Sequence, residues 1–237
     1  MKKDKIIYII IIVVILGFVI YKKFIEVPGH IAGQMAIEDL ISQVYYEDAH
    51  KHLEDIFIEN ENSFNSLVLP EFQDINEAPV GWIWNVLYNN LENEENKYTY
   101  EQIQEKLTNL FSSEFERKFP EEGIDGLIEK NIENNIYYKT EIKKDNTKKY
   151  GYCIKSLTQE DTMYKIYIIE YTLLCDEVTY TLIDKDGNEL KKYDYKDGIE
   201  EEIKEEISQN KYNLIQKEVA IKIEEAGKPN VISITKK

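Results

Sequence analysis

The chain has 237 residues, of which 43% are hydrophobic, so it is long enough to bury a substantial core and is not disordered by composition. It carries 45 Asp and Glu against 29 Lys and Arg, which gives a formal charge of −16. This excess of negative charge argues against contacts with the phosphates of nucleic acids or anionic lipids. The composition therefore predicts no nucleic-acid partner.

An apolar run near the N-terminus predicts a membrane segment. Residues 6–20 carry no charge, and continuing to Ile25 gives about 30 Å of helix, enough to cross a bilayer if Lys22 and Lys23 extend to the interface. A cleaved signal peptide is the alternative, but no site with small residues at alternate positions follows the run. We therefore predict an uncleaved transmembrane signal anchor over residues 6–25.

The flanking charges predict how the chain is oriented at the cell membrane. The basic tail, residues 1–5, is expected to stay in the cytoplasm, with a juxtamembrane linker over residues 26–33 and an extracytoplasmic domain over residues 34–237. Because five of the 29 basic residues and one of the 45 acidic residues lie in residues 1–25, the remainder has a formal charge of −20. The inverted topology, with a cytoplasmic domain, stays open.

Apolar residues at helical spacing dominate the chain up to about residue 134. Thr99 and Gln102 form a capping box before one such segment, and Pro79 fits the first turn of another. The pattern predicts helices over residues 37–57, 79–91, 99–111 and 127–132. The first of these is the longest and is strongly amphipathic.

From about residue 137 the pattern changes to alternating Tyr, Ile, Thr and Val, which is typical of strands. The predicted strands cover residues 150–157, 164–174, 178–183, 189–195, 217–223 and 231–235. Ile199, Ile203 and Ile207 recur every four residues and predict one late helix over residues 198–209. Helices gathered before strands indicate an α+β class, with amphipathic helices packed on a curved antiparallel sheet.

The order of an anchor, two or three amphipathic helices and then antiparallel strands resembles membrane-anchored NTF2-like (cystatin-related) domains, including the inner-membrane scaffold subunits of type IV secretion systems. That resemblance implies an NTF2-like roll. The segments Asp74–Glu77, Trp82–Trp84, Leu110–Phe111 and Lys118–Pro120 are similar to parts of small surface proteins of Firmicutes. This second resemblance implies no particular activity.

Two triplets of acidic residues and histidine could hold a divalent cation on the first predicted helix. Within each triplet the side chains share one helical face: Asp48, His52 and Asp55, and Glu47, His50 and Glu54. Neither has the spacing of a specific motif such as His-Glu-x-x-His, and a solvated charged face explains the same residues.

Two further features of the strand-rich half invite an interpretation. The stretch Asp184–Asn188 has calcium-loop composition, but its spacing does not match an EF-hand, so a hairpin turn is predicted. The two cysteines, Cys153 and Cys175, either form a disulfide or remain buried free thiols.

Trp82 and Trp84 either line an aromatic ligand pocket or pack in the core. The chain contains no Gly-x-Ser-x-Gly, P-loop or Rossmann signature, and we expect no cofactor. The leading hypothesis is a non-catalytic domain that binds another protein or scaffolds an envelope complex, using the long helix and a sheet face. The alternative is a cell-surface hydrolase or small-ligand-binding protein, with a pocket between helices and sheet.

Overall fold

A computed structural model describes residues 47–58, 68–92, 95–111, 115–142, 146–209, 211–223 and 229–237. The chain divides into two units, residues 1–47 and 48–237, and the fold below is that of the second. The predicted anchor, the linker and the start of the predicted long helix lie outside the described residues. Within those residues no helix is long and apolar enough to cross a membrane.

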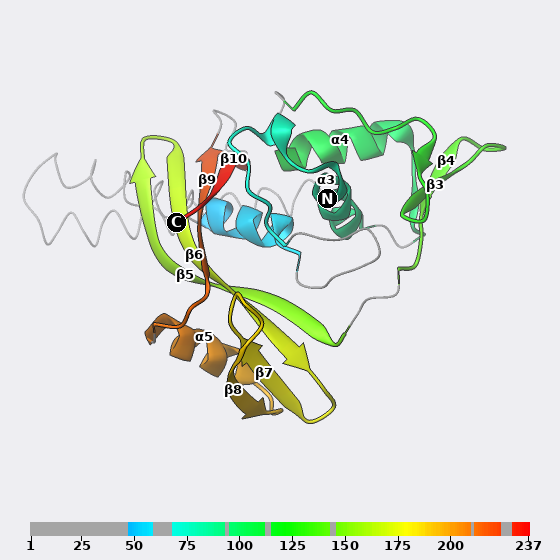
Figure 1. The fold of residues 1–237 in the computed structure, drawn as a ribbon. Helices are drawn as coiled ribbons and strands as arrows, with labels where there is room; N and C mark the ends of the chain where they lie inside the picture. Colours follow the sequence, from blue (N-terminus) through cyan, green and yellow to red (C-terminus); the bar gives the residue numbers. More distant parts are fainter. Residues whose placement is uncertain are drawn as a thin grey trace, which may run out of the picture. The chain divides into compact units, whose positions relative to one another are not determined.

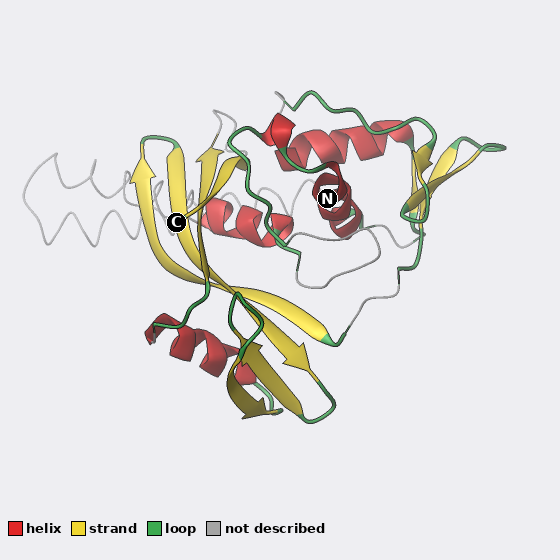
Figure 2. Ribbon diagram, viewed as in Figure 1, coloured by secondary structure: helices red, strands yellow, loops and turns green. Residues whose placement is uncertain are grey.

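The structure confirms an α+β class with antiparallel sheets (Figure 2). Residues 47–56 are helical, and the other helices are η1 (Ile75–Glu77), α3 (Val80–Asn90), α4 (Tyr100–Phe111) and α5 (Ile199–Gln209). The predicted helices over residues 79–91, 99–111 and 198–209 are therefore confirmed.

The capping box that the sequence predicts is formed at the start of α4. The backbone N–H of Thr99 donates to Oε1 of Gln102 at 2.9 Å, and the backbone N–H of Gln102 donates to Oγ1 of Thr99 at 3.3 Å. Each side chain thus satisfies a backbone group that the helix itself leaves without a partner.

The larger sheet has the order β10-β9-β6-β7-β8, and β5 pairs with β6 (Figure 1). Its strands are β5 (Lys148–Glu160), β6 (Met163–Cys175), β7 (Thr179–Ile183), β8 (Glu189–Asp194), β9 (Ile215–Ile223) and β10 (Pro229–Lys236). All six predicted strands are confirmed, several of them longer than expected. β5 and β6 form a hairpin of 13 residues on each side.

A second, smaller sheet lies within the half predicted to be helical. It has the order β1-β4-β3-β2, with β1 at Lys97–Tyr98, β2 at Gly123–Ile124, β3 at Ile128–Asn131 and β4 at Ile136–Lys139. The predicted helix over residues 127–132 is therefore wrong. Ile132 lies in the turn between β3 and β4 and is 90% exposed, so its helical spacing from Ile128 had no packing role.

The burial pattern of β6 changes phase along the strand. In its first half Tyr164, Ile166 and Ile168 are buried, whereas in its second half the buried residues are Tyr171 and Leu173. Because successive side chains of a strand point to opposite faces, β6 contributes to two cores, one on each face of the sheet.

The first core lies on the face covered by helix 47–56, α3 and α4. Trp82 of α3 packs between Phe72 and Phe111, with ring centroids 5.5 and 5.7 Å away. Phe72 also forms an antiparallel bridge with Ile234 of β10. These contacts bind the helices to the β9–β10 end of the sheet.

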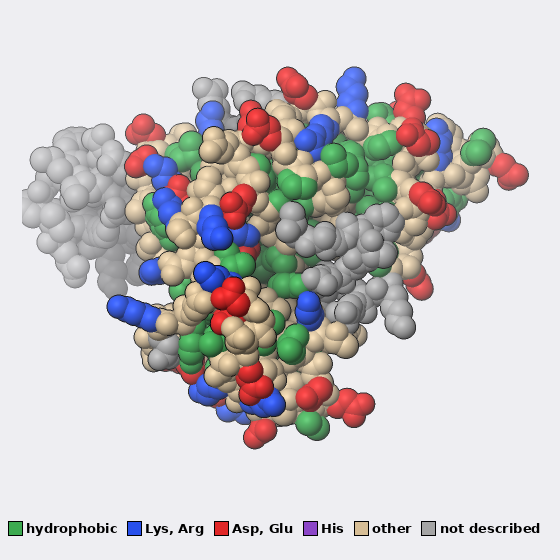
Figure 3. Space-filling view, in the orientation of Figure 1, with side chains coloured by type: hydrophobic (Ala, Val, Ile, Leu, Met, Phe, Trp, Pro, Cys, Tyr) green, Lys and Arg blue, Asp and Glu red, His purple; other side chains and the backbone are tan. Residues whose placement is uncertain are grey.

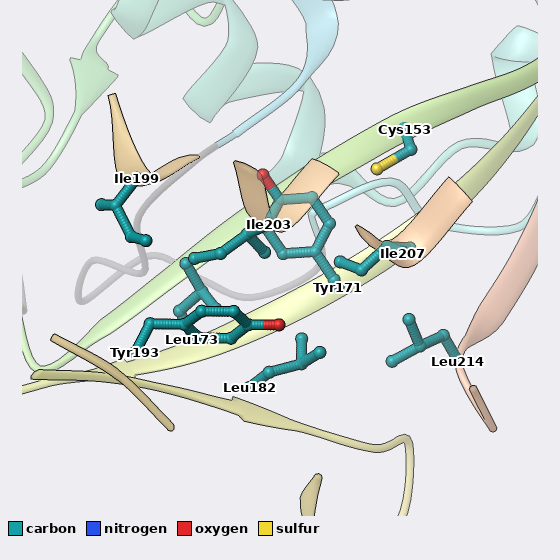
Figure 4. Close-up of a cluster of buried hydrophobic side chains, with 9 residues drawn as sticks. All are labelled: Cys153, Tyr171, Leu173, Leu182, Tyr193, Ile199, Ile203, Ile207 and Leu214. Carbon is teal, nitrogen blue, oxygen red and sulfur yellow. The ribbon is translucent and has the colours of Figure 1, made fainter. Parts of the chain in front are cut away.

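The second core lies on the opposite face, under α5. Ile199, Ile203 and Ile207 are buried and share one face of the helix, which they turn toward the sheet (Figure 4). The cluster that they complete also contains Cys153, Tyr171, Leu173, Leu182, Tyr193 and Leu214. The long β5–β6 ribbon is seen in Figures 1 and 2, and its strand β6 contributes side chains to both cores.

Candidate binding cleft

Two neighbouring residues of β5 fix a helical segment on each face of the strand. The ring of Tyr152 contacts that of Phe57, which follows helix 47–56, with centroids 4.7 Å apart. On the opposite face, Sγ of Cys153 lies 3.5 Å from the backbone oxygen of Lys204 in α5, the geometry of a weak hydrogen bond. β5 therefore runs between helix 47–56 and α5.

A cleft of about 840 Å³ opens along this part of β5. Residues 149–154 of β5 form its floor together with Tyr171. One wall consists of His50, Glu54 and Phe57, and the other of α5 side chains between Glu200 and Ser208. The cleft thus joins the amphipathic helix, the sheet and the late helix that the sequence predicts.

The walls of the cleft are mainly acidic. Four glutamates line it against two lysines: Glu54, Glu200, Glu201 and Glu205, with Lys149 and Lys204. Lys149 pairs with Glu200 at 2.8 Å and Lys204 with Glu201 at 2.9 Å. Charges of both signs are also interspersed on the face in Figure 3. The cleft therefore favours a cationic occupant, although exposure screens each charge.

The cleft contains one thiol, and it is not an activated one. Burial raises the pKa of Cys153 to about 11, and the nearby charge of Lys204 only partly opposes that effect. At neutral pH the side chain is therefore a protonated thiol, which is a poor nucleophile.

Cys153 and Cys175 are both free thiols, so the disulfide alternative is not what the structure shows. Cys153 lies opposite Ile169 of β6, and Cys175 is six residues further along that strand. At about 3.3 Å per residue the separation is on the order of 20 Å, whereas a disulfide needs Cα atoms within about 7 Å.

Gly151 makes the close packing at the floor possible. It lies directly opposite Tyr171, and a Cβ at position 151 would be 2.1 Å from Cζ of that tyrosine. Tyr171 itself is 4% exposed and belongs to the core under α5. A strand residue with a side chain would displace this ring.

The predicted metal triplets are not assembled. No group of three His, Cys, Asp or Glu side chains among the described residues is arranged to hold a metal ion. His52 is 2% exposed, and its Nε2 has no hydrogen-bond partner there. Asp55 instead pairs with Lys51 at 3.4 Å, and His50 lies 3.6 Å from Glu54. Among the described residues, Asp48, His52 and Asp55 are therefore not gathered into a metal site.

Trp82 and Trp84 do not line this cleft. Trp82 is 3% exposed within the first core, and Trp84 packs edge-on against Phe119 with centroids 5.9 Å apart. Both tryptophans therefore pack against other side chains, as the second of the two alternatives predicts.

The stretch Asp184–Asn188 is the predicted hairpin turn, in which Oδ1 of Asp184 accepts the backbone N–H groups of Asp186 and Asn188.

Comparison with known proteins does not assign this chain to a family. No family model matches the chain, and neither a curated protein nor a solved structure is significantly similar to it. The geometry and the charge of the cleft therefore carry the functional argument.

Two site features were missed by sequence reasoning. Gly151 interrupts a run of strand-forming residues, and such a glycine indicates a close approach. Glu170 lies within the apolar strand 164–174, and Lys217 begins the apolar strand 217–223. The two residues form an ion pair 2.8 Å apart that is almost completely buried, and a charged residue at a core-facing strand position is a signal of such a pair.

Proposed function

We propose that this protein is a membrane-anchored, extracytoplasmic domain that binds another protein, without catalysing a reaction, by taking an extended basic segment of that partner into the cleft along β5. The observation that carries the proposal is the cleft itself, with acidic side chains on both helical walls. A scaffolding role of this kind agrees with the resemblance to membrane-anchored NTF2-like domains.

The polarity of the cleft supports a peptide over a small molecule. Pockets for small ligands are mostly apolar and enclose their ligand, whereas this cleft is open and both walls carry glutamates. Tyr150 and Tyr152 at the floor and Phe57 in one wall add aromatic surface, which suits the apolar side chains of an extended segment. Alternating basic and apolar residues would satisfy both features.

The state of Cys153 supports binding rather than covalent chemistry, since its thiol is protonated at neutral pH. Glu200 and Glu201, the acids nearest the N-terminal end of α5, each hold a lysine in an ion pair. These lysines offset the charges of Glu200 and Glu201. The net negative charge of the cleft therefore comes from Glu54 and Glu205, and a net negative surface suits the recognition of an opposite charge.

The test uses the full chain in detergent and a defined probe, the acetylated and amidated peptide Lys-Val repeated four times. We expect saturable binding by calorimetry, weakened about tenfold by the double change Glu201→Lys and Glu205→Lys. Each reversal replaces an attraction by a repulsion at an exposed site, about 1 kcal/mol in total or slightly more.

The matched control is Glu101→Lys with Glu105→Lys. These residues have the same spacing and exposure on α4, away from the cleft. We expect this variant to bind the probe as the unchanged chain does. Equal weakening in both variants would mean that only the net charge matters, and absence of saturable binding would contradict the proposal.

The proposed location has its own test. We expect the chain to stay in the membrane pellet after alkaline carbonate extraction, and protease added to intact cells to remove the domain. Both results follow from an uncleaved anchor over residues 6–25 and an external C-terminal domain. Protection of the domain in intact cells would establish the inverted topology instead.

A further inference from the structure

The larger sheet contains a split that creates a second cavity. On the edge of β6 opposite β5, β9 pairs with residues 163–170 and β7 pairs with residues 172–175. Tyr171 falls between the two, where β7 leaves the edge and β9 joins it. Beyond this point the backbone N–H of Lys185 donates to the backbone oxygen of Asn213 at 3.2 Å, which ties the diverging chains together again.

The space left at the split is a cavity of about 240 Å³. Its apolar lining includes Val68, Leu69, Ile183, Leu214 and Ile215. Such a lining and volume suit a small molecule with an apolar body, slightly below the usual size of a drug-like ligand site.

One ion pair borders this cavity and is almost completely buried. Nζ of Lys217 lies 2.8 Å from Oε2 of Glu170, and the side chains are 9% and 11% exposed. The same Nζ donates to the backbone oxygen of Leu69. Burial raises the pKa of Glu170, and Lys217 acts in the opposite direction. A buried pair of this kind contributes little stability compared with apolar residues, so stability alone does not account for it.

The pair has unused hydrogen-bonding capacity. Oε1 of Glu170 is buried and has no hydrogen-bond partner in the described part of the chain. The ammonium group of Lys217 has three N–H donors, and Glu170 and Leu69 are its acceptors there. Both side chains line the cavity, and leaving one buried acceptor and one donor of the pair without partners costs free energy, which a group bound between the two side chains would recover.

The charge of the pair selects the kind of group that fits. A free carboxylate would be repelled by Glu170, and an ammonium group would be repelled by Lys217. A neutral amide or hydroxyl both donates and accepts hydrogen bonds, so it can serve both residues at once. We propose that the cavity between β7 and β9 is a binding site for a small neutral molecule that joins an amide or hydroxyl group to an apolar body.

The test compares four probes of nearly equal size: benzamide, benzyl alcohol, benzoate and benzylammonium. Each is titrated into the full chain in detergent, with the methyl groups of Ile and Leu observed by NMR. We expect benzamide and benzyl alcohol to shift the methyl signals of Leu214 and Ile215 saturably, and the two charged probes to bind at least tenfold more weakly.

Replacing the pair by apolar residues, Glu170→Leu with Lys217→Met, is expected to weaken benzamide binding at least tenfold while toluene binds more tightly. The control, Glu160→Leu with Lys165→Met, removes an exposed pair of the same hairpin, 2.8 Å apart, and leaves benzamide binding unchanged. If the variant Glu170→Leu with Lys217→Met does not fold, the difference in affinity among the four probes tests the proposal. No saturable shifts, or equal binding of all four, would overturn the proposal.

This inference rests on observations other than those behind the proposed peptide cleft, although Tyr150, Gly151 and Tyr171 line both cavities. The change Glu201→Lys with Glu205→Lys is expected to weaken the lysine-valine peptide and to leave benzamide binding unchanged. Loss of benzamide binding in that variant would show that the two cavities are one site, and would also count against a separate ligand site.

Discussion

Replacing Gly151 by alanine is expected to lower the free energy of unfolding by about 3 kcal/mol. The added Cβ would lie 2.1 Å from Cζ and 2.2 Å from Oη of Tyr171, so the ring must leave its place in the core under α5. Overpacking costs about 1–3 kcal/mol, and loss of a buried aromatic ring about 3–5 kcal/mol. Urea unfolding of the full chain in detergent measures the difference.

A double-mutant cycle with Tyr171→Leu distinguishes this clash from a general effect of alanine in a strand. Leucine at position 171 does not extend to the point where the Cβ would lie, so Gly151→Ala in that background is expected to cost less than about 1 kcal/mol. Equal costs in both backgrounds would show that the ring does not constrain position 151.

Acid is expected to destabilise the domain through His52. Burial lowers the pKa of this side chain from 6.5 to about 4. Between these two pH values His52 is therefore protonated in the unfolded chain and neutral in the folded chain. The contribution to stability is therefore complete above pH 6.5 and is lost as the pH falls toward 4. The full loss is roughly 3 kcal/mol.

The variant His52→Leu isolates this effect, because leucine is buried without titrating. Relative to the unchanged chain, it should gain stability steadily between pH 6.5 and 4, measured by urea unfolding at each pH. His50→Leu, at a side chain that is 36% exposed on the same helix, is the matched control for the loss of a histidine. A constant difference between His52→Leu and the unchanged chain would rule out buried His52 as the cause.

The sequence specified most of the secondary structure, because strongly periodic segments leave few alternatives. α5 and the strands after residue 148 follow their patterns closely. The helix predicted around Leu127 and Ile128 is wrong because two or three apolar residues fit a helix and a hairpin equally well. The turn residue Asn135, with a φ of 56°, lies between β3 and β4 of this hairpin.

The two cores and the cleft were harder to predict. A single strand, β6, changes its buried face between Ile168 and Tyr171, and only the adjacent Ile168 and Ile169 suggest this in the sequence. The pairing of Glu170 with Lys217 depends on which strands become neighbours in the sheet. Local patterns specify elements, whereas such sites arise from strand order, which the sequence pattern leaves open.

The most direct test of the proposed binding role is a map of where the lysine-valine peptide contacts the protein. The measurement is the change in backbone amide signals of the full chain in detergent as the peptide is added. We predict that the saturable changes fall on residues 50–57, 149–154 and 200–208, the two walls and the floor of the cleft. Changes spread over exposed acidic residues elsewhere, with none concentrated on these three segments, would contradict the proposed cleft function.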